Sequence, residues 1–259
     1  MENRFETFAV LHRGTEPLLI GNAWDAASAK AFEKQGYKAV GTSSAAVAAA
    51  LGYADGEEMS LDEYLLIIKR IVASVSVPVT VDLEGGYGKS IETICRNIHS
   101  LYNLGVTGIN IEDSVIHGGE RTIQQAEDFA LVLRGITQHL QKENIRMFIN
   151  VRSDSFLLGL ADALNDAKKR ASVYEQTGVH GLFFPCVVKL SDIEALTEAT
   201  HLPINVMCMP ELPSFNELKK AGVSRISFGP FLFNKVYRDL ETSISKITAD
   251  NSFKSLFLN

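Results

Sequence analysis

Three acidic side chains stand at the ends of two successive β-rich runs of the sequence. Asp82 ends the run 77–82, and Glu84 follows at alternate spacing, so both side chains point to the same side of an extended chain. Glu112 stands near the end of the next run, 108–113. Carboxylates packed into one small volume raise each other's pKa unless a cation lies between them. The pattern predicts a Mg2+ site, with Mn2+ as a substitute, because oxygen-rich sites favour these ions. Helix caps and surface acids at strand ends are the competing interpretation.

Other strand ends carry groups that can bind an anion. Arg152 ends the run 145–152, where its guanidinium can bind a carboxylate or phosphonate through two parallel hydrogen bonds, or can instead pair with Asp154. Ser43 and Ser44 precede a run of small residues. Backbone N–H groups at a helix start can receive an anion there, or the serines can simply cap the helix.

A histidine follows the fourth run. His117 lies in the loop 114–121, beside Gly118 and Gly119, which can act as hinges of a mobile lid. The alternative is an exposed loop histidine.

A β-rich run followed by a helical stretch occurs eight times along the chain. Strands are predicted at 17–22, 38–43, 77–82, 108–113, 145–152, 181–185, 202–207 and 224–229. Helices are predicted at 25–35, 60–74, 90–103, 122–141, 161–177, 191–199, 214–221 and from 231 onward. Several runs are apolar on both faces, which is typical of buried parallel strands. Eight such units predict an α/β fold, a closed (β/α)8 TIM barrel, whose active site lies at the C-terminal ends of the strands. An open doubly wound sheet would need a glycine-rich fingerprint after the first strand, which the segment 21–24 does not provide.

Length and composition favour one domain, 1–259, with a helical tail at about 231–259. The chain has 259 residues, 46% hydrophobic and 22% charged, and a net charge of −6. It shows no basic stripe for nucleic acid and no run of the roughly 18 apolar residues that a membrane span needs. The three cysteines are widely spaced, so neither a disulfide framework nor a zinc site is indicated. These features predict a cytoplasmic protein.

Five fragments together resemble the isocitrate lyase/phosphoenolpyruvate mutase superfamily, in particular its phosphonomutase-like branch. They are NAWDAASA (22–29), GTSSAAVAAALGYAD (41–55), VPVTVDLEGGYG (77–88), GINIEDS (108–114) and INVRSD (149–154). The resemblance implies a TIM barrel, usually with a helix exchanged between subunits, in a homodimer or homotetramer. It also implies a small anionic 2-oxo or 2-hydroxy acid as substrate and a Mg2+-stabilised enolate.

The resemblance further implies roles for individual residues. Asp82 matches the most direct metal-side carboxylate, Glu84 stands where many members have Asp, and Glu112 matches a glutamate that usually reaches the metal through water. The remaining matches are to groups around the substrate: Trp24 in the strand-one signature, Ser43 and Ser44 on the substrate carboxylate, Asp55 near the reacting group, and Arg152 on the substrate. Asn205 is a further predicted substrate-binding residue because it stands at the end of the seventh run.

The loop after the fourth run departs from the family pattern. C–C lyases of the family usually carry a Lys/Arg-Cys-Gly-His sequence there, whose cysteine is the acid/base, whereas this chain reads SVIHGGER at 114–121. Three functions therefore stay open. The first is a Mg2+-dependent lyase that cleaves or forms a C–C bond of a 2-oxo or 2-hydroxy acid. The second is phosphonomutase or phosphonopyruvate hydrolase chemistry on a P–C bond, with His117 as acid. The third is a non-catalytic barrel that binds a 2-oxo acid and regulates.

Overall fold

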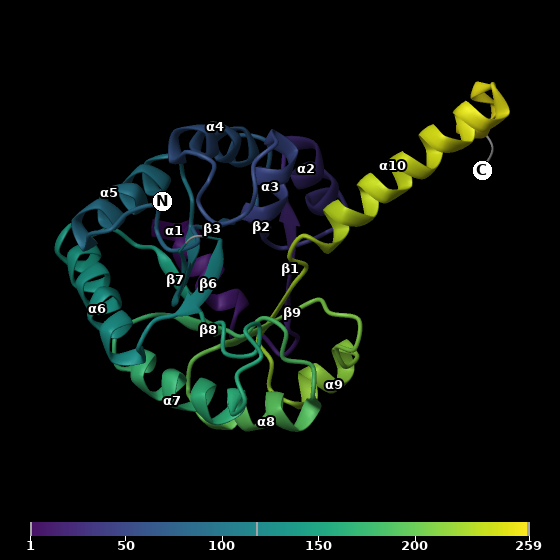
Figure 1. Cartoon of the computed structure of the whole chain (residues 1–259). Coiled ribbons are helices and arrows are strands. Elements are labelled where there is room, and N and C mark those ends of the chain that lie inside the picture. The colour runs from purple at the N-terminus through teal and green to yellow at the C-terminus, as the bar shows by residue number, and fades with distance from the viewer. Residues whose placement is uncertain (1, 118, 258–259) are drawn as a thin grey trace.

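Eight parallel strands close into a barrel in the computed structural model, which describes residues 2–117 and 119–257 (Figure 1). Around the barrel the order is β1, β10, β9, β8, β7, β4, β3 and β2. Their bounds are β1 Leu18–Ala23, β2 Val40–Thr42, β3 Val79–Asp82, β4 Gly108–Glu112, β7 Phe148–Arg152, β8 Gly181–Phe183, β9 Ile204–Met207 and β10 Arg225–Ser227. Every strand of the barrel overlaps a predicted run, and the predicted (β/α)8 barrel is confirmed.

Helices follow the strands as the alternating pattern predicts, and all of those named next except α10 pack around the barrel (Figure 1). They are α2 Ala26–Lys34, α4 Leu61–Val72, α5 Ile91–Asn103, α6 Ala126–Lys142, α7 Ala163–Glu175, α8 Leu190–Glu198, α9 Phe215–Lys220 and α10 Phe231–Asp250, which η1 Phe253–Leu256 follows. A short helix, α3 Ser44–Leu51, stands directly after β2. Capping boxes begin several of them: Ser60 and Glu63 bond each other's backbone at the start of α4, as their spacing predicts.

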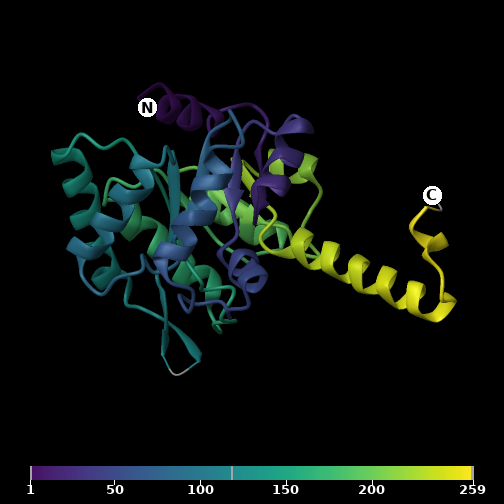
Figure 2. The ribbon, with the colours of Figure 1, turned by 90° about the horizontal axis from the view of Figure 1, so that it is seen from above.

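Two elements at opposite ends of the barrel were not predicted (Figure 2). Helix α1 Glu2–Leu11 covers the end where the strands begin, and its Phe8 packs edge-on against Phe148. At the other end, β5 Ser114–His117 and β6 Glu120–Ile123 form an antiparallel hairpin in the segment expected to be a loop. The β5–β6 hairpin projects from the end of the barrel where an active site is expected.

The middle of the barrel is polar. Asn150 Nδ2 donates to Asn110 Oδ1 at 2.9 Å and to Asn205 Oδ1 at 3.2 Å, which links three strands. Arg225 is fully buried and donates from Nη2 to Asn110 Oδ1 at 3.3 Å. These linked amides form a polar layer in the barrel below the strand ends, which we call the amide layer.

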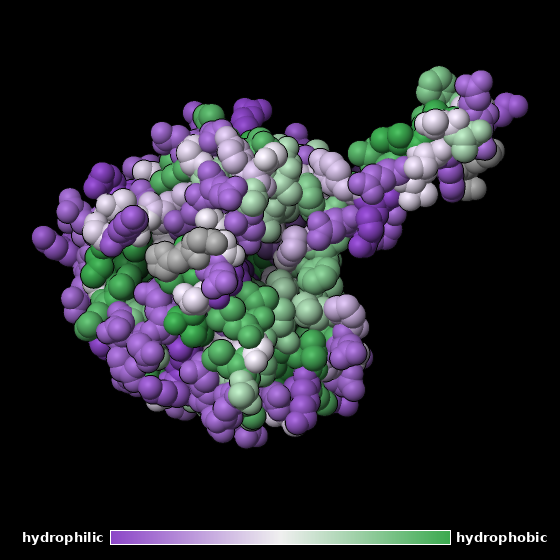
Figure 3. Space-filling model, in the orientation of Figure 1, coloured by the Kyte–Doolittle hydropathy of each residue, from purple (hydrophilic) through white to green (hydrophobic). Residues whose placement is uncertain are grey.

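Helix α10 extends away from the barrel (Figures 1 and 2). Only Phe233 of this helix is buried, edge-on against Trp24 at 5.3 Å between ring centroids. Hydrophobic residues lie along its free part (Figure 3), with Val236, Leu240 and Ile244 each more than two-fifths exposed. Within the described residues, no helix is both long and apolar enough to cross a membrane. The domain limits stay a prediction.

Candidate functional site

A cavity of about 310 Å³ opens at the C-terminal ends of the strands. Five residues predicted from the sequence line it, namely Ser43, Ser44, Asp55, Asp82 and Arg152. The other lining residues are Asn22, Ala45, Asn110, Arg121, Leu157, Phe183, Pro185, Met207, Ser227, Gly229 and Pro230. The predicted anion-binding residues and one predicted metal ligand therefore lie in one small volume at the C-terminal ends of the strands.

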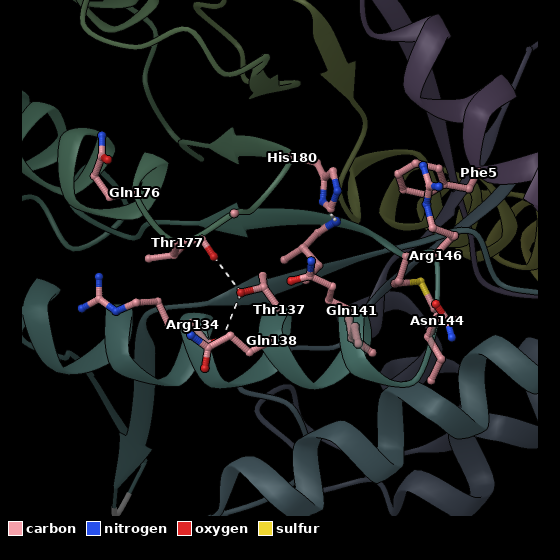
Figure 4. A pocket seen from close by; sticks show the side chains of 15 residues that line it. Phe5, Arg134, Thr137, Gln138, Gln141, Asn144, Arg146, Gln176, Thr177 and His180 are labelled. Carbon is pink, nitrogen blue, oxygen red and sulfur yellow. Dashed lines mark hydrogen bonds between the residues drawn. The ribbon is translucent and has the colours of Figure 1, made fainter.

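A larger hollow lies elsewhere, at the end where β7 begins (Figure 4). It has a volume of about 640 Å³ and is lined mainly by α6 and by the turns before β7 and β8. Two of its polar side chains bond the protein itself: Thr137 donates to the Thr177 carbonyl, and His180 Nδ1 accepts from the Ile149 N–H. Among the described residues that line it, none is an acid or a cysteine. The smaller cavity at the strand ends is therefore the candidate active site, because acidic and guanidinium side chains line it.

Asp82 presents an unsatisfied oxygen at the end of β3. Its Oδ2 accepts a hydrogen bond from Ser44 Oγ at 2.9 Å, while its Oδ1 is buried without a hydrogen-bond partner. Burial raises the pKa of this carboxyl, and the nearby Arg152 guanidinium opposes the shift. An unpaired buried acceptor is costly, so Oδ1 is suited to a cation or a donor brought by a ligand.

The two serines begin α3 beside Asp82. Ser43 Oγ accepts from the Ala46 N–H as the N-cap, and its backbone N–H donates to the Ala23 carbonyl, so it is a cap in this structure. Ser44 follows as the first helical residue, and its hydroxyl holds Asp82. The helix start thus lies in the wall of the cavity, where its dipole favours an anion.

Glu84 does not join the cavity. Its Oε2 accepts from the Glu57 N–H at 2.9 Å, its Oε1 accepts from the Tyr87 hydroxyl at 3.1 Å, and Glu57 Oε1 in turn accepts from the Tyr87 N–H. The three residues have φ of +63° (Glu57), +51° (Glu84) and +54° (Tyr87), which is unusual for side-chain-bearing residues. We call this arrangement the Glu57–Glu84–Tyr87 clasp. Burial raises the pKa of Glu84 to about 8, and the Asp55 and Asp82 carboxylates add to the shift.

Glu112 is buried between two guanidinium groups. Its Oε2 lies 2.8 Å from Arg152 Nη1, and its Oε1 accepts from Arg121 Nη1 and from Ser114 Oγ. Burial raises the pKa of Glu112, opposed by the arginines. Oε2 has this ion-pair contact but no hydrogen-bond partner, and both oxygens face a guanidinium group, which makes the carboxylate less available to a metal.

Arg152 pairs with Asp154, as the alternative interpretation predicted. Its Nε and Nη2 bond the two carboxylate oxygens of Asp154 at 2.6 and 3.0 Å. Asp154 has no exposed surface, so this is a buried fork. The guanidinium still lines the cavity, but the N–H groups on its forked edge are not free to clamp a substrate.

Arg121 of the hairpin is a site residue that the sequence interpretation missed. Its Nη1 also bonds Ser114 Oγ at 2.7 Å and Asp154 Oδ2 at 3.3 Å, and its Nη2 lies 3.5 Å from Asp55 Oδ2. The available signal was the Gly118–Gly119 pair between β-branched residues, a pattern that predicts a hairpin.

Three other predicted residues are placed differently. Trp24 does not line the cavity, because its ring packs against Phe233 at the base of α10. Asn205 lies below the cavity, in the amide layer, and donates to Ser227 Oγ. His117 ends β5, and its side chain lies outside the described part of the structure.

The predicted three-carboxylate cluster is not found. Across residues 2–117 and 119–257, no group of three or more His, Cys, Asp or Glu side chains is arranged to hold a metal. The reasons are local: Glu84 is turned into the clasp and Glu112 is paired with arginines. Among the described residues Asp82 Oδ1 has neither a hydrogen-bond partner nor an ion pair, whereas the unbonded Oε2 of Glu112 contacts Arg152, so Asp82 is the carboxylate better suited to a metal.

Comparison with known proteins gives consistent matches. Residues 8–248 match the family model described as phosphoenolpyruvate phosphomutase. A solved structure from Burkholderia cenocepacia, of a protein classed as a phosphonomutase, is 35% identical, has a TM-score of 0.88 and covers 94% of this chain and 99% of its own. An oxaloacetate decarboxylase of Bradyrhizobium diazoefficiens is 31% identical over 74% of this chain and 66% of its own length. A 2-methylisocitrate lyase of Escherichia coli is 27% identical over 93% of this chain and 83% of its own.

Proposed function

This chain belongs to the phosphoenolpyruvate phosphomutase family, and we propose that it is a Mg2+-dependent enzyme that cleaves or forms a C–C bond next to the carbonyl of a small 2-oxo or 2-hydroxy acid. The observation that carries the proposal is the convergence of the α3 start, Asp82 and Arg152 in one cavity at the strand ends. Relatives named as a decarboxylase and a lyase support bond cleavage of this kind.

Asp82 is the proposed direct ligand of the metal. Its Oδ1 is buried and lacks a partner, and Mg2+ commonly takes only one or two carboxylates while substrate and water fill its other positions. The charges also fit. Asp55 and Asp82 line the cavity, and the buried carboxylates of Glu112 and Asp154 lie behind them. These four acids face the guanidinium groups of Arg121 and Arg152. When bound, Mg2+ would stabilise negative charge that develops on the substrate's keto oxygen.

The substrate carboxylate is proposed to lie at the start of α3. Backbone N–H groups of this helix start and the positive end of its dipole favour an anion there. Ser43 and Ser44 fix that helix start, and Ser44 also fixes Asp82. The Arg152 guanidinium contributes positive charge to the same wall while its fork holds Asp154.

Asp55 is the proposed carrier of a proton at the mouth. Among the described residues that line the cavity, none is a lysine, histidine or cysteine. The side chain of Asp55 is 42% exposed, so it can exchange protons with solvent, which Asp82 on its buried side cannot. His117 remains a predicted acid.

P–C bond chemistry is the second candidate. It is favoured by two guanidinium groups in one small cavity, because a phosphonate carries two negative charges and accepts charge-assisted hydrogen bonds well. The 35% identical relative classed as a phosphonomutase points the same way.

Calorimetric titration with oxalate and with pyruvate, with and without Mg2+, tests the proposal. Wild type should bind both only when Mg2+ is present, and Asp82→Asn should abolish that binding while its unfolding temperature stays close to that of wild type. Asp62→Asn, at an exposed position on α4, removes the same charge as a control. Metal-independent binding, or binding retained by Asp82→Asn, would overturn the assignment.

We also propose that α10 packs against a second copy of this chain in a homodimer or homotetramer. Val236, Leu240 and Ile244 recur at every fourth residue and so form one apolar face along a helix that touches the barrel only at its base. A helix is stabilised mainly by packing of such a face, and large exposed apolar patches usually mark interfaces. A cytoplasmic location stays a prediction from the sequence.

A further inference from the structure

Arg121 reaches the cavity from outside the barrel. It lies on β6, and the hairpin pairs Ile116 with Arg121 across its two strands. The side chain is only 16% exposed, so the hairpin places a largely buried guanidinium at the strand ends. Glu112, Ser114 and Asp154 all accept from a single nitrogen, Nη1.

Charge compensation of the buried acids explains only part of this arrangement. Glu112 and Asp154 already contact Arg152, which bonds both oxygens of Asp154. The second terminal nitrogen of Arg121, Nη2, has a much weaker contact, 3.5 Å to the partly exposed Asp55. Nη2 is therefore the nitrogen of this guanidinium that is most available to donate a hydrogen bond to a ligand in the cavity.

The surroundings hold Arg121 in place. Gly56, next to Asp55, has a φ of +103°, and a Cβ there would come within 2.3 Å of the Ile116 side chain of β5. The loop that carries Asp55 thus packs directly on the hairpin. The same loop is tied to β3 through the Glu57–Glu84–Tyr87 clasp. Hairpin and loop fix the guanidinium from two sides, which lowers the entropy lost when a ligand binds.

We propose that Arg121 is a specificity-determining residue whose guanidinium binds a second anionic group, carboxylate or phosphonate, on the C3 side of the substrate. This inference rests on the proposed function, because that function places the first carboxylate and the keto oxygen at α3 and Asp82. A second anion extending from there toward the mouth meets the Asp55 carboxylate, which repels it. Arg121, within 3.5 Å of Asp55, supplies the opposite charge at that place.

Three ligands that differ only at C3 test the proposal. They are 2-oxobutyrate with a methyl group, oxaloacetate with a carboxylate and phosphonopyruvate with a phosphonate, and pyruvate is the reference. Dissociation constants are measured by calorimetry with Mg2+ for wild type, Arg121→Gln and Arg121→Lys. Arg96→Gln is the matched control, because Arg96 is exposed on α5.

Wild type should bind one or both C3 anions about tenfold or more tightly than 2-oxobutyrate, a typical effect of one charge-assisted hydrogen bond. Arg121→Gln should remove this preference. The preference is the ratio of the dissociation constants of the C3 anions and of 2-oxobutyrate within each variant, so a general change in affinity cancels. Arg121→Lys keeps the charge but loses the planar fork, so it should retain a reduced preference even where the glutamine variant is unstable. The ratio between oxaloacetate and phosphonopyruvate identifies which anion the site takes.

Failure of this inference differs from failure of the proposed function. If pyruvate and oxalate do not bind wild type with Mg2+, the proposed function falls. If they bind but the C3 preference is absent, or is the same in wild type, Arg121→Gln and Arg121→Lys, the role of Arg121 is overturned and the proposed function stands.

Discussion

Replacing Glu84 with glutamine distinguishes a structural clasp from a metal ligand. In the folded protein both carboxyl oxygens accept hydrogen bonds, from the Glu57 N–H and the Tyr87 hydroxyl. Burial raises the pKa of Glu84 from 4.5 to about 8. A group with a raised folded-state pKa contributes stability that is fully present below the unfolded pKa and is lost as the pH rises through the folded pKa. Wild type should therefore lose stability from this carboxyl between pH 4.5 and about 8. Glutamine, which does not titrate, removes that loss.

The expected size follows from the same shift. Each pH unit inside that window is worth about 1.4 kcal/mol for one fully shifted group. The free energy of unfolding of Glu84→Gln relative to wild type should rise by about 2 kcal/mol between about pH 5.5 and pH 7. Urea unfolding at both pH values, followed by circular dichroism in buffer with a chelator, measures it. Glu92→Gln, exposed in the first turn of α5, is the matched control and should show no such change.

Two outcomes would refute the reasoning. A difference between Glu84→Gln and wild type that does not change with pH would mean that the carboxyl is ionised in the folded protein. Loss of Mg2+-dependent oxalate binding in a folded Glu84→Gln protein would mean that the carboxylate ligates the metal, as the D-x-E spacing first predicted. The clasp predicts that this binding is retained.

Three further predictions concern other parts of the molecule. Arg152→Lys should weaken Mg2+-dependent oxalate binding and also lower the unfolding temperature, because it breaks the buried fork with Asp154; an unchanged affinity would remove Arg152 from the binding wall. Burial lowers the pKa of His12 from 6.5 to about 3, so stability present above pH 6.5 is lost as the pH falls. Between about pH 6.5 and 4.5, the free energy of unfolding of His12→Phe should thus fall by about 2 to 3 kcal/mol less than that of wild type, as measured by thermal or urea unfolding. An equal fall in both proteins would contradict this prediction. The double change Leu240→Glu and Ile244→Glu should reduce the mass of the oligomer measured by analytical ultracentrifugation, whereas the control Glu241→Gln should not. A mass unaffected by the double change would exclude α10 from the interface between subunits.

The barrel and much of its site were predictable because both depend on simple spatial rules. Buried parallel strands must be apolar, and all of them end at the same face, so polar residues directly after the apolar runs converge. This placed Ser43, Ser44, Asp82 and Arg152 correctly around one cavity. The rule uses only the order of residues along each strand and does not depend on side-chain partners.

Glu84 escaped prediction for a physical reason. The alternate spacing of Asp82 and Glu84 puts both on one side only while the chain stays extended. Strand β3 ends at Asp82, and Glu84 adopts a left-handed φ of +51°, so the chain turns before the second carboxylate. A local pattern cannot report this turn, because the partners that hold it, Glu57 and Tyr87, include a residue 27 positions away.

The β5–β6 hairpin has the greatest bearing on the chemistry. The Lys/Arg-Cys-Gly-His sequence that the resemblance leads one to expect of a C–C lyase is missing after the fourth barrel strand, and this segment carries Arg121, which cannot lose its proton near neutral pH. Arg121 therefore supplies positive charge to the cavity and no proton. Proton transfer is left to Asp55, to water or to His117, while Arg121 and Arg152 can only bind and neutralise. A reaction whose leaving group departs as an anion gains from a guanidinium at the mouth. Decarboxylation, in contrast, is slowed by a guanidinium that binds the carboxylate to be lost. Such a guanidinium stabilises the charged ground state more than the transition state, in which that charge leaves the carboxylate. The preference for oxaloacetate or phosphonopyruvate at Arg121 consequently bears on which bond is broken as well as on which substrate binds.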